Sequence, residues 1–156
     1  SDLTKKIIAR EIPFVWANAR FFYDRPEKLT RNKPERTVHL GPHIMPLFEA
    51  AQHELLIASP YFVPGKEGLA WFTNMRSKLT TLKVLTNSLA ATDVIAVHAG
   101  YKKYRKRLLE AGVELFELKP TARKKLSKTK KLIQGSSTAS LHAKYMVVDG
   151  RYVFIG

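Results

Sequence analysis

The chain has 156 residues, 45% of them hydrophobic, which is enough for one domain with a sizeable core and excludes a disordered chain. It contains no cysteine, so disulfides and thiolate chemistry are excluded, and its apolar runs fall far short of the roughly 20 residues of a membrane-spanning helix. Lys and Arg number 27 against 13 Asp and Glu, and the net charge of +14 favours anionic partners such as nucleic acid, lipid headgroups or phosphate esters.

The first 35 residues mix charges, prolines and isolated aromatics without a sustained period of 3.6 or 2. We expect residues 1–36 to form a connector and residues 37–156 to form one domain. The chain begins with serine, and Gly156 falls inside an apolar strand pattern. We interpret this as a piece of a longer protein whose last domain is truncated at its C-terminal end.

From residue 41 the apolar pattern becomes regular. A stripe of apolar residues predicts an amphipathic helix over 44–51, and the nearly all-apolar run LLIASPYF predicts a strand covered on both faces. A second helix is expected over 67–79, and TLKVLTN follows as a second strand. The chain thus begins to alternate helix and strand.

A third helix and strand continue this alternation. Thr92 or Asp93 can cap the helix by accepting a backbone N–H, and Gly112 lies where a left-handed stop is needed. VELFEL is then the third strand. Such alternation predicts an α/β fold with a mixed, mostly parallel β-sheet flanked by helices.

A basic segment interrupts the alternation over residues 119–137, with seven Lys or Arg and no acid. It could dock on anionic lipid, since each basic residue near such a surface contributes about 1 kcal/mol, or it could be a solvated loop. The aromatic residues that single-strand nucleic-acid binders interleave with basic ones are absent there, so nucleic acid is the less expected partner. The candidate lipid contacts are Lys119, Arg123, Lys124, Lys125, Lys128, Lys130 and Lys131.

The last residues predict a β-hairpin that carries three polar side chains. LHAKYMVV and YVFI are the strands, and Asp149-Gly150 is a strong turn signal between them. On a strand, His142 and Lys144 would point to one face about 6.6 Å apart. Histidine suits proton transfer or nucleophilic attack, and an ammonium stabilises charge on a phosphoryl oxygen. The trio therefore predicts attack on a phosphate ester, although a packed histidine, a solvated lysine and a turn-forming aspartate remain the structural alternative.

Other polar residues are weaker candidates. Ser59, Thr86 and Ser88 lie near strand ends, where α/β proteins gather their sites, but turn and capping roles are expected to prevail. His98 lies on the apolar face of its helix, which favours a packed, hydrogen-bonded histidine.

The residues HxKxxxxD at His142, Lys144 and Asp149 resemble the signature of the phospholipase D superfamily. Four stretches are similar to its bacterial cardiolipin synthase branch and span residues 54–156: SPYFVPG, LTNSLAATD, AVHAGYKKYRKRLLEAGVELFEL and GSSTASLHAKYMVVD. FFYDRPEK resembles the connector between the two halves of such enzymes, which makes this chain their C-terminal half. The resemblance implies the layered phospholipase D-like fold.

The resemblance also implies a mechanism without metal or other cofactor. Two signature motifs, one per half or per subunit, meet to form one site, and a histidine of one motif forms a phosphohistidine. His142 would be the general acid and base, Lys144 would bind phosphate oxygens, and Asp149 would be the orienting carboxylate. The implied partners are anionic phospholipids and an N-terminal half or second subunit with its own motif, at a bacterial inner membrane, peripherally or at its cytoplasmic face.

The leading hypothesis is therefore half of a phosphatidyltransferase of cardiolipin synthase type. The chain has one HxKxxxxD motif and no second histidine in a matching context, so we expect it to be inactive by itself unless it dimerises through the motif face. A nuclease of the same superfamily and a non-catalytic module that binds anionic surfaces remain as alternatives.

Overall fold

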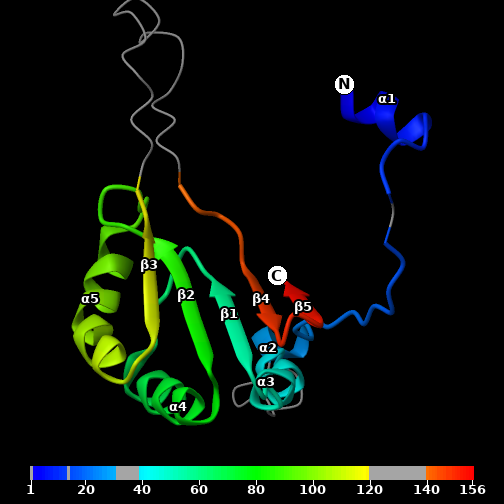
Figure 1. The fold of residues 1–156 in the computed structure, drawn as a ribbon. Coiled ribbons are helices and arrows are strands. Elements are labelled where there is room, and N and C mark those ends of the chain that lie inside the picture. The colour runs from blue at the N-terminus through cyan, green and yellow to red at the C-terminus, as the bar shows by residue number, and fades with distance from the viewer. Residues whose placement is uncertain (1, 14, 31–38, 120–139) are drawn as a thin grey trace, which may run out of the picture. The chain divides into compact units, whose positions relative to one another are not determined.

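The computed structural model describes residues 2–13, 15–30, 39–119 and 140–156 (Figure 1). The chain divides into two units, Ser1–His43 and Ile44–Gly156, each of which is described by itself. The predicted boundary between residues 36 and 37, and all but Lys119 among the predicted lipid contacts, lie outside the described residues.

The first unit contains two short helices, α1 (Asp2–Ile8) and α2 (Glu27–Thr30). Each carries or adjoins an i,i+4 ion pair between exposed side chains, Lys6–Asp2 at 3.1 Å and Lys28–Asp24 at 2.7 Å. Such pairs add little stability. Trp16 is 92% exposed, so this aromatic side chain finds little packing within the unit.

The second unit is built on a five-stranded mixed sheet in the order β3-β2-β1-β4-β5. The strands are β1 (Glu54–Ala58), β2 (Thr81–Asn87), β3 (Glu114–Leu118), β4 (Tyr145–Val148) and β5 (Tyr152–Ile155). β1 pairs in parallel with β2, and β2 with β3, whereas β4 is antiparallel to both β1 and β5. This arrangement confirms the predicted α/β class with a mixed sheet.

Three helices pack on one face of this sheet: α3 (Gly41–Glu49), α4 (Gly65–Lys78) and α5 (Ile95–Glu110). The side chains that alternate toward them form the core and are almost fully withdrawn from water, because burying apolar area drives folding. The strand residues of this core are Leu55, Ile57, Leu82, Val84 and Val148, and the helices add Phe48, Leu69, Phe72, Met75, Tyr101 and Leu108.

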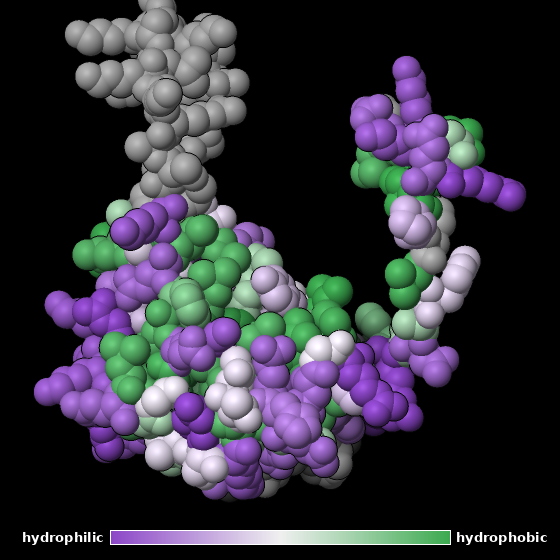
Figure 2. Space-filling view, in the orientation of Figure 1, coloured by the Kyte–Doolittle hydropathy of each residue, from purple (hydrophilic) through white to green (hydrophobic). Residues whose placement is uncertain are grey.

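Among the described residues of the second unit, no helix lies on the opposite face of the sheet. Its side chains remain accessible at Phe116 (48% exposed), Val153 (62%) and Ile155 (80%), and hydrophobic surface extends over the region of the strands in Figure 2. Within LLIASPYF, Leu55 (0% exposed) and Ile57 (6%) are buried on the helix side, whereas Leu56 on the other face is partly buried, so the second face of β1 is covered only in part. An apolar run reports which residues avoid water, and it does not say which element covers them.

The two ends of α5 met the predictions differently. Gly112 adopts φ +84°, so the left-handed stop is confirmed. The predicted cap is wrong, because the N-cap residue is Val94, which makes no side-chain capping bond, and Thr92 Oγ1 accepts only the N–H of Val94 itself, at 3.2 Å, just before the helix. The Asp93 carboxylate instead accepts a hydrogen bond from the Tyr61 hydroxyl at 2.9 Å, a tertiary contact that replaces local capping.

The other two helices lie where they were predicted but with shifted ends, and α3 spans Gly41–Glu49 in place of the predicted 44–51. α4 begins two residues earlier than expected, at Gly65, and ends one residue earlier, at Lys78. Phe72 and Met75 are buried on it as predicted, with Trp71 only partly buried. Among the described residues, no helix is both long and apolar enough to cross a lipid bilayer.

Candidate functional site

The chain that leads into β4, drawn in orange in Figure 1, passes the edge of the sheet where the parallel strands end, and it carries His142 and Lys144. β4 runs antiparallel to β1 and starts at Tyr145, opposite Ala58, the last residue of β1. The residues just before Tyr145 therefore stand beside the carboxyl ends of β1 and β2. This edge is where open α/β sheets place their ligand sites.

The prediction that both residues lie within a strand was wrong, because β4 begins one residue after Lys144. β1 ends at Ala58, and the next backbone amide, that of Ser59, donates to Leu85 O of β2 instead. Pro60 follows and has no N–H to donate. On the side of β5, the last backbone hydrogen bond to this chain runs from Gly156 N to Lys144 O at 2.8 Å.

Lys144 lies between the His142 main chain and an aromatic ring. Its Nζ is 3.4 Å from His142 O and 5.8 Å from the centroid of the Tyr61 ring, within the range of a cation–π contact. The hydrogen bond to Asp93 raises the pKa of Tyr61, with desolvation and the Asp93 charge acting in the same direction. The side chains of His142 and Lys144 are both exposed, so this edge presents an imidazole and an ammonium to incoming anions.

Asn87, the last residue of β2, holds the chain just before His142. Its side chain is only 3% exposed. Oδ1 accepts from Leu141 N at 2.8 Å, while Nδ2 donates to Leu141 O at 3.1 Å and to Ser140 Oγ at 3.3 Å. The Asn87 side chain thus hydrogen-bonds to both the N–H and the carbonyl of Leu141, the residue that precedes His142.

Asp149 lies at the other end of β4, and the structure does not bring it to His142 and Lys144. Asp149 lies five positions after Lys144 along extended chain, a path of about 16 Å. The carboxylate accepts bonds from Glu54 N and His53 N at 2.8 Å and from Gln52 N at 3.0 Å. These bonds, that from Glu54 first, hold the pKa of Asp149 below its usual value. Asp149 thus ties the hairpin turn to the chain that enters β1, and its φ of +51° suits that turn.

The chain matches known proteins along its whole length. The family model described as "Cardiolipin synthase, PLD-like domain" matches residues 44–156. Cardiolipin synthase C of Escherichia coli (strain K12) is 40% identical over 156 residues, which cover 100% of this chain and 33% of that protein. An uncharacterized protein of Helicobacter pylori (strain ATCC 700392 / 26695) is 31% identical over 162 residues, covering 100% and 30% of the two chains. A cardiolipin synthase of Geobacillus sp. (strain WCH70) is 32% identical over 111 residues, covering 70% and 18%.

The chain belongs to this PLD-like family. The family confirms the resemblance recognised in the sequence and the fold class predicted from it. The chain spans about a third, or less, of the length of these relatives.

The other polar candidates occupy structural positions. Thr86 is 3% exposed, and the Ser88 carbonyl accepts the amides of Ala91 and Thr92 in a turn. His98 is packed as predicted, 8% exposed and edge-on to Tyr101, but its Nε2 has no hydrogen-bond partner among the described residues. The predicted hydrogen bond of His98 is therefore not found at Nε2. Within the same ranges, no three His, Asp or Glu side chains converge as metal ligands.

Sequence reasoning missed Asn87, Tyr61 and Asp93 as parts of this edge. Asn87 and Tyr61 lie within the stretches LTNS and SPYF, and a polar residue that ends a buried strand was the available signal for Asn87. Its partners are more than fifty positions away, at residues 140 and 141. Only the pairing of β1 with β4 brings them together.

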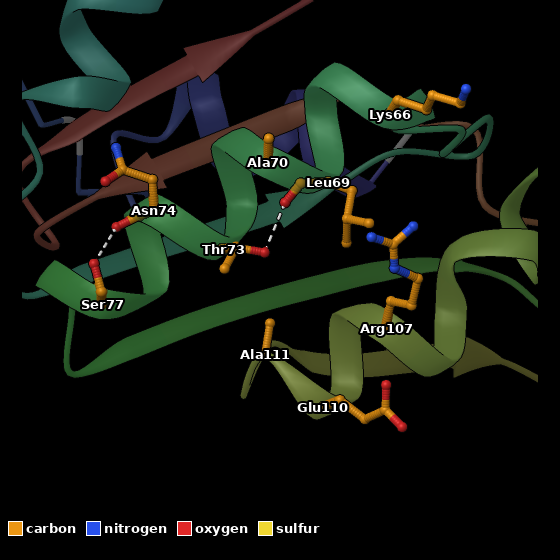
Figure 3. A pocket seen from close by; sticks show the side chains of 9 residues that line it. All are labelled: Lys66, Leu69, Ala70, Thr73, Asn74, Ser77, Arg107, Glu110 and Ala111. Atoms are coloured by element: carbon orange, nitrogen blue, oxygen red, sulfur yellow. Dashed lines mark hydrogen bonds between the residues drawn. The ribbon is translucent and has the colours of Figure 1, made fainter.

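A shallow groove lies apart from this edge, between α4 and α5 (Figure 3). Lys66, Arg107 and Glu110 border it. Its hydroxyls are bonded to α4 carbonyls, Thr73 Oγ1 to Leu69 O at 2.8 Å and Ser77 Oγ to Asn74 O at 2.7 Å. None of the candidate catalytic residues lines the groove, so the candidate site is the exposed edge and not this hollow.

Proposed function

We propose that this chain supplies one half of the active site of a PLD-type phosphatidyltransferase of the cardiolipin synthase kind. The observation that carries the proposal is the pairing of His142 with Lys144, both exposed beside the carboxyl ends of the parallel strands. Membership of the PLD-like family supports it, and so does the name of the Escherichia coli relative.

In the proposed reaction, a histidine from a second motif attacks the phosphorus of a phospholipid. A phosphorus–nitrogen bond forms as the bond to the leaving alcohol breaks, and His142, as general acid, gives that alcohol its proton. An incoming lipid alcohol then loses its proton to His142 and displaces the first histidine. Each step returns His142 to the protonation state that the next one needs.

Lys144 would bind the non-bridging phosphate oxygens, since its ammonium stands next to His142 and carries the charge that the transition state requires. Asp149 would act at a distance. Its three backbone bonds hold the hairpin in position, and we assign it an orienting role without contact to phosphate.

The site would be completed by another half or subunit, because the chain has a single HxKxxxxD motif. We therefore expect the purified 156-residue chain to be inactive unless it dimerises through the His142 edge. Sedimentation and a phosphodiester assay on the same sample test this. Turnover by a monomer at the rate of the complete enzyme would refute it.

Anionic phospholipids are the proposed substrates, and the basic segment 119–131 is the proposed contact with their surface, peripherally at a bacterial inner membrane. The charge of +14 supports this, and so does the exposure of Lys119, the one described member of the segment. Binding to vesicles should rise with their anionic lipid content and fall as salt increases.

The decisive experiment compares lipid products of the complete protein with those of its His142→Ala variant. Vesicles would contain phosphatidylglycerol and phosphatidylethanolamine. We expect cardiolipin from the first and a loss of about 10²-fold or more in the second, since proton transfer typically contributes that much. His53→Ala is the matched control, because this exposed histidine lies beside Asp149 at the opposite edge.

A superfamily nuclease is the second candidate, favoured by the net charge. Cleavage of DNA that depends on His142, with no change in lipids, would establish it in place of the transferase. Its binding should also weaken steeply with salt, since several phosphates would be neutralised. If neither lipid nor DNA changes while vesicle binding survives His142→Ala, the chain is a binding module.

A further inference from the structure

Asn87 makes an unusually complete set of contacts for one side chain. A buried amide needs hydrogen-bond partners, and Asn87 uses both donors and one acceptor position on just two residues, Ser140 and Leu141. With Leu141 it forms a reciprocal pair, as a neighbouring strand would, by accepting its N–H and donating to its carbonyl. Asn87 thus takes the place of a strand partner where the ladder of β4 has ended.

This contact fixes one end of the short stretch that carries the candidate catalytic residues. The other end is held by Gly156 N, which donates to Lys144 O. His142 lies between these two anchors, directly after Leu141. Because its side chain is exposed, its position depends chiefly on how firmly the backbone on either side is held.

We propose that Asn87 is a positioning residue for His142, an assignment that rests on the proposed function above. It acts through Leu141 and touches no substrate. Its anchor is rigid, because β2 is a central strand bonded to β1 on one side and to β3 on the other. Loss of the Asn87 side-chain amide would leave the His142 imidazole less firmly positioned, and a displacement of 1 Å can cost about 10²-fold in rate.

The first test uses the 156-residue chain and does not depend on activity. Hydrogen exchange of the Leu141 amide and relaxation of the His142 ring would be measured by NMR in wild type and in Asn87→Ala. We expect exchange at Leu141 to accelerate at least tenfold and the His142 ring to become more mobile. Asn74→Ala is the matched control, since this asparagine is exposed on α4 in the groove of Figure 3 and should change neither quantity.

A second variant covers the case in which Asn87→Ala does not fold. Asn87→Asp keeps an oxygen for Leu141 N but loses both donors, so Leu141 should stay protected while His142 gains intermediate mobility. Unchanged His142 relaxation in the folded variants overturns the proposal, whatever happens at Leu141.

The second test uses the complete protein and the vesicle assay. We expect Asn87→Ala to lower kcat by about 10-fold to 10²-fold with KM for lipid within about twofold, because chemistry and not binding depends on where the imidazole lies. A wild-type kcat in a variant with a mobile His142 overturns the proposal. If wild type makes no lipid product at all, the proposed function fails, and the NMR result still decides whether Asn87 positions His142.

Discussion

Leu108 and Leu109 are neighbours on α5 with opposite environments, and they offer a sharp test of how this helix lies on the sheet. Leu108 is 0% exposed and belongs to the core, whereas Leu109 is 52% exposed. Replacing Leu108 with alanine should remove about 3 to 5 kcal/mol from the free energy of unfolding, the sum of lost burial and the cavity left behind.

The same change at Leu109 should cost about 1 kcal/mol. The three carbon groups removed are worth roughly 0.8 kcal/mol each when fully buried, and about half of the side chain is already in water. Helix propensity affects the two variants equally, so the difference reports packing alone. Since a domain of this size has only about 5 to 15 kcal/mol of stability, the first variant should be visibly destabilised.

Urea unfolding, followed by circular dichroism, measures both variants under one set of conditions. With a slope of about 1 to 3 kcal/mol per molar urea, the midpoint should fall by roughly 1 M or more in Leu108→Ala and clearly less in Leu109→Ala. Equal losses would mean that Leu109 is covered by another surface. A larger loss at Leu109 would mean that α5 is rotated, and His98 and Tyr101, which share its buried face, would then be misplaced too.

Three further outcomes are expected from single substitutions. Asp149→Asn should lower the urea midpoint at pH 7. Because the folded pKa of Asp149 lies below 3.8, the stability that its ionised carboxylate adds is complete above that value and should be lost as the pH falls through the lowered pKa. A difference in midpoint between wild type and variant that is as large at pH 3 as at pH 7 would contradict this. Gly112→Ala should cost about 1 to 2 kcal/mol, since φ is +84° there and the new Cβ would lie 3.2 Å from Arg76 Nε; a neutral result would argue against the left-handed turn. Tyr61→Phe should lower kcat severalfold in the vesicle assay without abolishing it, as Asp93 loses its partner and the ring under Lys144 is freed; wild-type kcat would remove Tyr61 from the site.

The repeating helix and strand pattern of the sequence was sufficient to predict the fold, because each element carries its own period and most are bounded by Pro, Gly or polar residues. The left-handed stop at Gly112 was predictable for the same reason, since a local conformation decides it. The cap of α5 was not, because Asp93 has a partner 32 positions away in Tyr61. Local chemistry predicts an element well when no distant residue competes for the same group.

The candidate site likewise contains some residues that the sequence could predict and others that it could not. His142 and Lys144 could be found from spacing, because two residues of one local stretch carry the pattern. Asn87 and Tyr61 could not, since their relation to that stretch exists only once β1 lies between β2 and β4. Sequence therefore identified the groups suited to chemistry and missed the groups that hold them.

The spacing of the HxKxxxxD pattern acquires a physical meaning from this geometry. The four residues between Lys144 and Asp149 form β4. The spacing of the pattern therefore equals the length of one strand, which runs from the carboxyl ends of the parallel strands to their amino ends. Side chains alternate along that strand, and Val148 is buried in the core only in this register. The bonds from Asp149 to residues 52–54 fix where the crossing ends, and this in turn fixes where it begins, at Lys144. We therefore interpret Asp149 as the residue that fixes the register of β4, and this register places His142 and Lys144 at the candidate site, at the other end of the strand.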